Sequence, residues 1–214
     1  MGNYLLKFFE KEQYLNDFLN GKLYMNTLKY FKENQSLDIA RLDKFETIVE
    51  HKKSNFNAIQ IGKASFERNK GELAGGSTIL TTKNYDFCNI LCLYSLWKNT
   101  DNEHIEMDTR NKIFGNYCIV ITNVSEFLKR IIAATNRENF VCYHAGINYI
   151  SKNQIIIIEE EKIPFTKFDS FSYQREFRIA INTQRNIDEP YILDIGEIRD
   201  IIKITTFDNI CIIN

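Results

Sequence analysis

The chain has 214 residues, of which 44% are hydrophobic and 26% charged, a composition that excludes wholesale disorder. Its 27 basic and 28 acidic side chains leave no basic excess to attract nucleic acid, and no stretch approaches the roughly 18 apolar residues that span a bilayer. We therefore expect a cytoplasmic protein that forms one domain over residues 1–214, with no membrane contact and no nucleic-acid partner.

The cysteines predict free thiols rather than disulfides or a metal site. They are odd in number and lie in apolar, strand-like runs of a kind that is usually buried. The five positions are Cys88, Cys92, Cys118, Cys142 and Cys211. No set of Cys and His residues has the spacing of zinc ligands, so we expect no metal.

The first twenty-one residues predict a strand and then a helix. Residues 4–9 (YLLKFF) form a short apolar run typical of a strand. Residues 11–20 follow with Tyr14, Leu15, Phe18 and Leu19 at the spacing of one helical face. Gly21 then provides the left-handed conformation that commonly ends a helix.

A second strand is predicted over residues 22–27. Alternation along this strand turns Leu23 and Met25 to one face and Tyr24 and Asn26 to the other. A polar, Asn-rich loop follows at once. Polar side chains are therefore expected at the end of a half-buried strand, where binding sites are often built.

The middle of the chain is less regular. Residues 32–56 have little periodicity and form either a surface excursion or a site loop. Residues 58–61 and 77–82 resemble short strands that could pair as a hairpin. Residues 87–97 are continuously apolar, which favours a central strand, with a helix as the alternative. The charged residues 98–112 indicate a solvated loop or a short exposed helix.

The second half contains the clearest helix signal. After a strand over residues 117–122, Asn123 can cap a helix with Glu126 at its third position. The apolar face of this helix consists of Val124, Phe127, Leu128, Ile131 and Ile132.

The remaining segments predict strands. Residues 140–150 and 154–158 look like a strand pair, and residues 177–181, 191–193 and 201–206 complete the sheet. The expected fold is a single α+β domain with a mixed, mostly antiparallel sheet and about two principal helices.

A polar row interrupts the apolar strand SYQREFRIAI at residues 172–181. In an extended strand Gln174, Glu176 and Arg178 share one face. Burial of an unpaired carboxylate costs several kcal/mol, so Glu176 needs a partner, solvent or a ligand. Two readings remain open: a structural ion pair of Glu176 with Arg178 or Arg41, and a ligand-facing set.

Several motifs together resemble a known but poorly characterised family. These are LYMNTLKYF at residues 23–31, Arg41 with Asp43 and Glu46, Lys167, and YQREFR at residues 173–178. The pattern is similar to bacterial and phage proteins of which several are linked to abortive infection. This resemblance implies a role in phage or mobile-element conflict, as defence or counter-defence.

The order of elements also resembles ADP-ribosyltransferase-like proteins. In those proteins a Gln-x-Glu precedes a late strand, and its carboxylate holds a ribose hydroxyl of NAD and stabilises an oxocarbenium-like state. The resemblance implies that Glu176 is the key carboxylate and that Gln174 orients the substrate. The first strand lacks the His or Arg that such enzymes place there, so whether the chain is an enzyme stays open.

These observations lead to a first hypothesis, a nucleotide-like and NAD-related ligand in a cleft between strand 22–27 and strand 172–181. The candidate catalytic residues are Glu176 and Gln174. The candidate ligand-binding residues are Arg41, Arg178, Tyr24, Asn26, Tyr30, Asp43, Glu46, Lys167 and Tyr173. Arg41 and Arg178 would contact phosphate or carboxylate, and Tyr24 or Tyr30 would stack on a base.

The alternative is a protein-binding inhibitor or antitoxin module without catalysis, acting on a host or phage protein partner. It would use the charged segments around residues 32–51 and 98–110 rather than a cleft.

Overall fold

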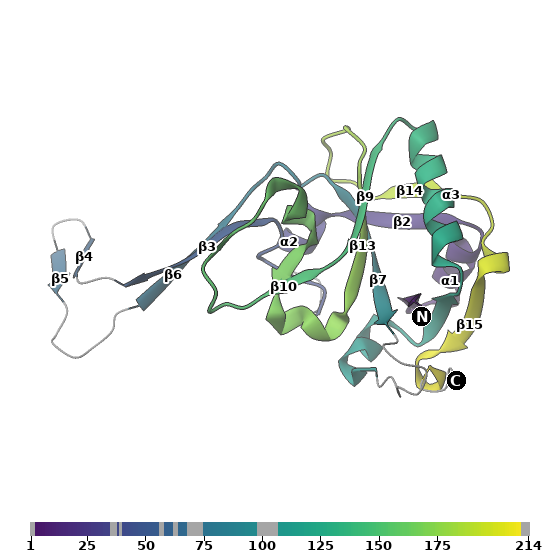
Figure 1. Ribbon diagram of the computed structural model, residues 1–214, viewed down its shortest axis with the longest axis horizontal. Helices are drawn as coiled ribbons and strands as arrows, with labels where there is room; N and C mark the ends of the chain where they lie inside the picture. Colours follow the sequence, from purple (N-terminus) through teal and green to yellow (C-terminus); the bar gives the residue numbers. More distant parts are fainter. Residues whose placement is uncertain are drawn as a thin grey trace.

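An antiparallel sheet of eight strands forms the body of the molecule (Figure 1). The computed structural model describes residues 3–34, 38, 40–55, 58–61, 64–67, 75–97 and 107–210. Along the sheet the order is β14 (Tyr191–Asp194), β2 (Lys22–Thr27), β7 (Asn89–Trp97), β1 (Asn3–Phe9), β8 (Tyr117–Ile121) and β15 (Ile202–Thr206). Strand β13 (Glu176–Asn182) also pairs with β7, and β9 (Val141–Gly146) pairs with β13.

Helices α1 (Glu12–Leu19) and α3 (Val124–Arg137) cover one face of this sheet. Phe127 and Ile131 of α3 are at most 1% exposed and pack in the main core with apolar residues of both helices and six strands. The side chain of Asn123 accepts a hydrogen bond from the backbone N–H of Glu126, which confirms the predicted cap. Ile132 is 41% exposed, so its expected place on the buried face is wrong.

Shorter elements cover the opposite face. They are α2 (Leu28–Glu33), the 3₁₀ turns η2 (Glu160–Phe165) and η3 (Asp169–Gln174), and the parallel pair of β10 (Asn148–Ile150) and β12 (Thr166–Phe168). Leu28 and Phe165 pack there against Ile90 and Ala180, which belong to β7 and β13. Thr27 caps α2 by accepting a hydrogen bond from the N–H of Tyr30 at 3.0 Å.

A β-ribbon extends away from the main sheet (Figure 1). It consists of β3 (Ile48–Asn55) and β6 (Gly75–Thr81), with β11 (Ile156–Ile157) added beside β3. Strands β4 (Ala58–Ile61) and β5 (Ala64–Glu67) form a separate pair at its far end. The expected hairpin between residues 58–61 and 77–82 is therefore wrong, because β4 pairs with β5 and β6 pairs with β3.

The expected pairing of residues 140–150 with 154–158 is also wrong. Strand β9 pairs with β13, β10 with β12, and β11 with β3. The remaining elements are η1 (Thr109–Phe114), η4 (Arg199–Ile201) and η5 (Phe207–Asn209). Within the described ranges all strand pairs except β10–β12 are antiparallel, and α1 and α3 are the longest helices, so the predicted α+β class is confirmed.

Gly21 fixes the turn from α1 into β2. Its φ of 80° is left-handed, as predicted, and an added Cβ would lie 1.8 Å from the carbonyl oxygen of Gly196. Only glycine fits this close approach without strain. The turn therefore places β2, with Tyr24 and Asn26 on its outward face, immediately beside the end of α1.

Candidate functional site

The site begins as a split in the main sheet. One edge of β7 pairs with β13, whereas its other edge pairs with β1 at Tyr94 and beyond and with β2 at Asn89 and Ile90. Strands β1 and β2 diverge between these contacts. Residues 91–93 of β7 therefore face an opening rather than a neighbouring strand on this edge.

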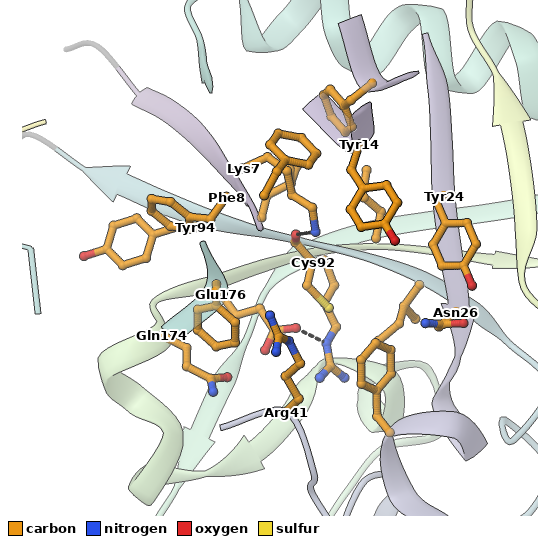
Figure 2. Close-up of a pocket in the computed structure, with 18 of the residues that line it drawn as sticks. Lys7, Phe8, Tyr14, Tyr24, Asn26, Arg41, Cys92, Tyr94, Gln174 and Glu176 are labelled. Carbon is orange, nitrogen blue, oxygen red and sulfur yellow. Dashed lines mark hydrogen bonds and ion pairs between the residues drawn. The ribbon is translucent and has the colours of Figure 1, made fainter. Parts of the chain in front are cut away.

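The backbone of Cys92 points into this opening. Alternate residues of an antiparallel strand direct their N–H and C=O groups to opposite edges. Since the N–H of Ser95 donates to Arg175 on the β13 side, Cys92 faces the other edge. Its carbonyl oxygen accepts a hydrogen bond of 2.9 Å from the ammonium of Lys7, which reaches across from β1 (Figure 2).

A cavity of about 740 Å³ lies at this split. This volume is within the range of about 300–1,000 Å³ that is usual for small-molecule sites. The walls come from β1, α1, β2, α2, β7, η1, β12, η3, β13, β14 and the turn at residues 40–46. Segments far apart in the sequence thus meet around one space, as a binding site requires.

Most residues that the sequence predicted for the site line this cavity. They are Tyr24, Asn26, Tyr30, Arg41, Glu46, Lys167, Gln174, Glu176 and Arg178. Two others do not. Asp43 belongs to the turn at residues 40–46 but is only 2% exposed. Tyr173 borders a separate hollow, where the guanidinium of Arg110 lies 3.9 Å from the centre of the Tyr173 ring.

Four charged side chains form a buried network in one wall. Arg178 donates to both oxygens of Glu46, at 2.9 and 2.6 Å, and through Nε to Glu176 at 2.6 Å. Lys167 donates to the second oxygen of Glu176 at 3.1 Å and lies 3.6 Å from Glu46. The two positive charges of the network equal its two negative charges, and buried charges are tolerated in a protein interior when they are paired in this way.

This network keeps Glu176 ionised. Burial alone would raise the pKa of Glu176, but the positive charges of Arg178 and Lys167 hold it well below its usual range. Both carboxylate oxygens already accept a hydrogen bond. Because each oxygen of an ionised carboxylate can accept more than one hydrogen bond, Glu176 can still accept another or stabilise positive charge. It has no proton to donate at neutral pH.

Gln174 joins the network to the turn at residues 40–46. Its Oε1 accepts from Lys167 at 3.1 Å, and its Nε2 donates to the carbonyl oxygen of Ala40 at 2.7 Å. The sequence placed Gln174 in one strand with Glu176, but β13 begins at Glu176. Gln174 ends η3 instead, and the left-handed Arg175, with a φ of 40°, separates the two.

Aromatic rings form the opposite wall. Tyr14 of α1 and Tyr24 of β2 are 50% and 54% exposed, and Figure 2 shows them across the cavity from Gln174 and Glu176. Tyr30 packs edge-on against Phe31 at 5.3 Å. These rings offer apolar faces beside hydroxyl groups, a combination suited to planar, polar ligands.

Arg41 lies at one side of the cavity and holds the turn at residues 40–46 in place. Its guanidinium contacts Glu10 and Asp38, each at 2.5 Å, and lies 5.4 Å from the ring centre of Phe114. Because Glu10 directly follows β1, this ion pair ties the turn to the edge of the split.

Lys7 and Cys92, like Tyr14, are polar residues of the cavity that the sequence analysis did not assign to the site. Burial lowers the pKa of Lys7 below its ordinary value and raises the pKa of Cys92 to about 12, so Cys92 remains a neutral thiol. The sequence carried a signal for Lys7, since it is the one charged residue within the apolar run YLLKFF. Nothing in the pattern around Cys92 marked it.

The described part of the chain has no group of three or more Cys, His, Asp or Glu side chains that could hold a metal ion. Nor does it contain a helix that is long and apolar enough to cross a membrane. Comparison with protein-family models, with curated proteins and with solved structures found no match to this chain.

Proposed function

We propose that this chain binds a nucleotide-like ligand in the cavity between β1 and β2. The observation that carries the proposal is the convergence of tyrosine rings, amide side chains and charged groups around a space of about 740 Å³. A nucleotide combines a planar base, ribose hydroxyls and an anionic group. The cavity provides a complementary feature for each of these parts.

The geometry suggests how such a ligand is held. The base stacks on Tyr24 or Tyr14, the most exposed rings of the cavity, while Asn26 provides donors and an acceptor beside them. Glu176 accepts a hydrogen bond from a ribose hydroxyl at the other wall. Arg178 is turned inward to Glu46 and Glu176, so its role is to fix the position of Glu176.

NAD is the ligand to test first, and transfer or hydrolysis at its glycosidic carbon is the reaction. An ionised Glu176 fits the stabilisation of an oxocarbenium-like state, which is the role implied by the ADP-ribosyltransferase resemblance. The role in phage or mobile-element conflict rests on the sequence motifs alone. Binding is the part of the proposal that the cavity supports most directly.

Calorimetric titration with NAD and with ADP-ribose tests the proposal. Because a base stacked on an aromatic ring contributes about 1–3 kcal/mol, Tyr24→Ala should weaken binding roughly 5- to 150-fold. Tyr143→Ala is the matched control, since Tyr143 on β9 is also 54% exposed but lies outside the cavity. No heat with either compound, or equal effects of the two substitutions, would refute the proposal.

Catalysis has its own test. If the chain cleaves NAD, Glu176→Gln should abolish release of nicotinamide while NAD still binds. Thermal unfolding of the variant checks that the fold survives the loss of one network charge. Full activity of a folded Glu176→Gln variant would exclude Glu176 as the catalytic carboxylate.

One observation favours the second function, a protein-binding module. Ile155, Ile157 and Leu80 are exposed by 65%, 75% and 47%. Ile157 and Leu80 lie in one row across the ribbon, because each pairs with Glu50 of β3. The contacts predicted around residues 32–51 are less suitable, since Glu46 and His51 of that segment are buried.

A pull-down from the native host, followed by mass spectrometry of proteins and small molecules, separates the two functions. A protein partner that is lost with Ile157→Ser but retained with Tyr24→Ala would establish the module. A co-purified nucleotide that is lost with Tyr24→Ala alone would establish the ligand site.

A further inference from the structure

Lys7 differs in its partners from the other cations of the cavity that are not exposed, Arg41, Lys167 and Arg178. Arg178 and Lys167 are each bound to carboxylates within the network, and Arg41 is bound to Glu10 and Asp38. Within the described ranges, Lys7 has no carboxylate within ion-pair distance. Its one hydrogen bond goes to a neutral acceptor, the carbonyl oxygen of Cys92. An ammonium group has three N–H donors, so two remain for a ligand.

The surroundings make this arrangement costly for the protein alone. Lys7 is half-buried, and its ammonium lies at the carbonyl oxygen of Cys92 in the split of the sheet. Glu176, a carboxylate whose charge acts on Lys7, is held by Arg178 and Lys167 instead. A cation away from bulk water without a counter-ion gains more than an exposed one when an anion arrives.

We infer that Lys7, at the open edge of β7, is the phosphate-binding group of the cavity and takes the anionic part of a nucleotide. This inference rests on the function proposed above and specifies it. It assigns to Lys7 the contact that the sequence analysis assigned to Arg41 and Arg178. Figure 2 shows the Lys7 amine directed into the cavity at the split.

Adenosine and AMP form a matched pair of probes, because they differ only in the phosphate. In the wild-type protein AMP should bind at least about tenfold more tightly than adenosine. Lys7→Met keeps the length of the side chain and removes its charge. This variant should bind both compounds equally, with the affinity for adenosine unchanged.

Lys22→Met is the control, since Lys22 also lines the cavity but is exposed on β2. It should retain the preference for AMP. Equal binding of AMP and adenosine by the wild-type protein, or an unchanged preference in Lys7→Met, would overturn the inference while leaving nucleotide binding intact.

Failure of the proposed function gives a different result. If neither adenosine nor AMP binds, the nucleotide proposal fails, and inorganic pyrophosphate becomes the probe for the subsite. Pyrophosphate binding that Lys7→Met abolishes and Lys22→Met retains would still support Lys7 as an anion site. No heat with pyrophosphate would overturn it.

A measurement on the wild-type protein covers the case in which Lys7→Met does not fold. Acetic anhydride acetylates accessible amines, and mass spectrometry compares Lys7 with the exposed Lys203. AMP should slow acetylation of Lys7 relative to Lys203, and adenosine should slow it less. Equal protection by both compounds, or none, would refute the contact between Lys7 and phosphate.

Discussion

The buried charge network makes a quantitative prediction at Arg178. This side chain is 1% exposed and holds Glu46 and Glu176 through three hydrogen bonds. Arg178→Met fills a similar volume but leaves two interior carboxylates with only Lys167 as a counter-ion. Breaking a buried pair in this way costs about 3–5 kcal/mol, because one charge stays buried without compensation. We expect a loss of that size in the unfolding free energy.

Urea unfolding followed by circular dichroism measures this loss, and Arg130 provides a matched control. Arg130 also binds two carboxylates, Glu126 at 3.0 Å and Asp200 at 2.5 Å, but its side chain is 24% exposed and theirs are 37% and 58% exposed. Solvent screens such pairs, so Arg130→Met should cost less than about 1 kcal/mol. Equal losses for the two substitutions would show that burial does not set the strength of the network.

Two further predictions concern a carboxyl group and a turn. Burial, and then the charge of Glu46, raise the pKa of Asp43 from 3.8 to about 6. The folded state therefore binds this proton more tightly than the unfolded state, and Asp43 lowers stability as pH rises from about 4 to about 6, by about 2–3 kcal/mol at most. Asp43→Asn should raise the unfolding free energy at about pH 7.5 relative to wild type, but not at about pH 4. Gly21→Ala should cost more than about 1 kcal/mol in the same assay, because of its positive φ and the carbonyl oxygen of Gly196. Gly146→Ala, with nothing within 4 Å of the new Cβ, should cost less than about 0.5 kcal/mol.

Each of these two predictions can be contradicted by a specific outcome. An Asp43→Asn variant whose stability relative to wild type is the same at both pH values would show that the carboxyl group titrates normally. If Gly21→Ala and Gly146→Ala unfold at the same urea concentration, the turn has no special requirement for glycine.

Local patterns predicted the elements that build one wall of the cavity. The bounds of β2 are those expected, and its alternation correctly turned Tyr24 and Asn26 away from the core. The left-handed conformation of Gly21 and the Asn123 cap were also predicted correctly, because each depends on residues close in sequence. Such features are fixed by backbone geometry, which periodicity and capping preferences describe directly.

Strand pairing could not be predicted from local sequence patterns in the same way. Partners such as β6 with β3, or β9 with β13, are decided by packing between residues distant in sequence. The importance of Lys7 follows from pairing too, because the opening that it faces exists only where β1 and β2 diverge along β7. A periodicity argument sees a strand at residues 4–9 but not the gap beside it.

Two contributions of the charge network can be distinguished, the compensation of buried charge and the hydrogen bonds that Arg178 makes. Apolar residues of similar size often replace a buried ion pair without loss of stability, so balance matters more than charge. The double variant Arg178→Met with Glu46→Leu removes one cation and one carboxylate, and it leaves Lys167 paired with Glu176 at 3.1 Å. We expect it to be within about 1–2 kcal/mol of wild type, well above Arg178→Met alone. A double variant as unstable as the single one would mean that the hydrogen bonds of Arg178 themselves, and not its compensation of buried charge, hold β13 against the turn at residues 40–46.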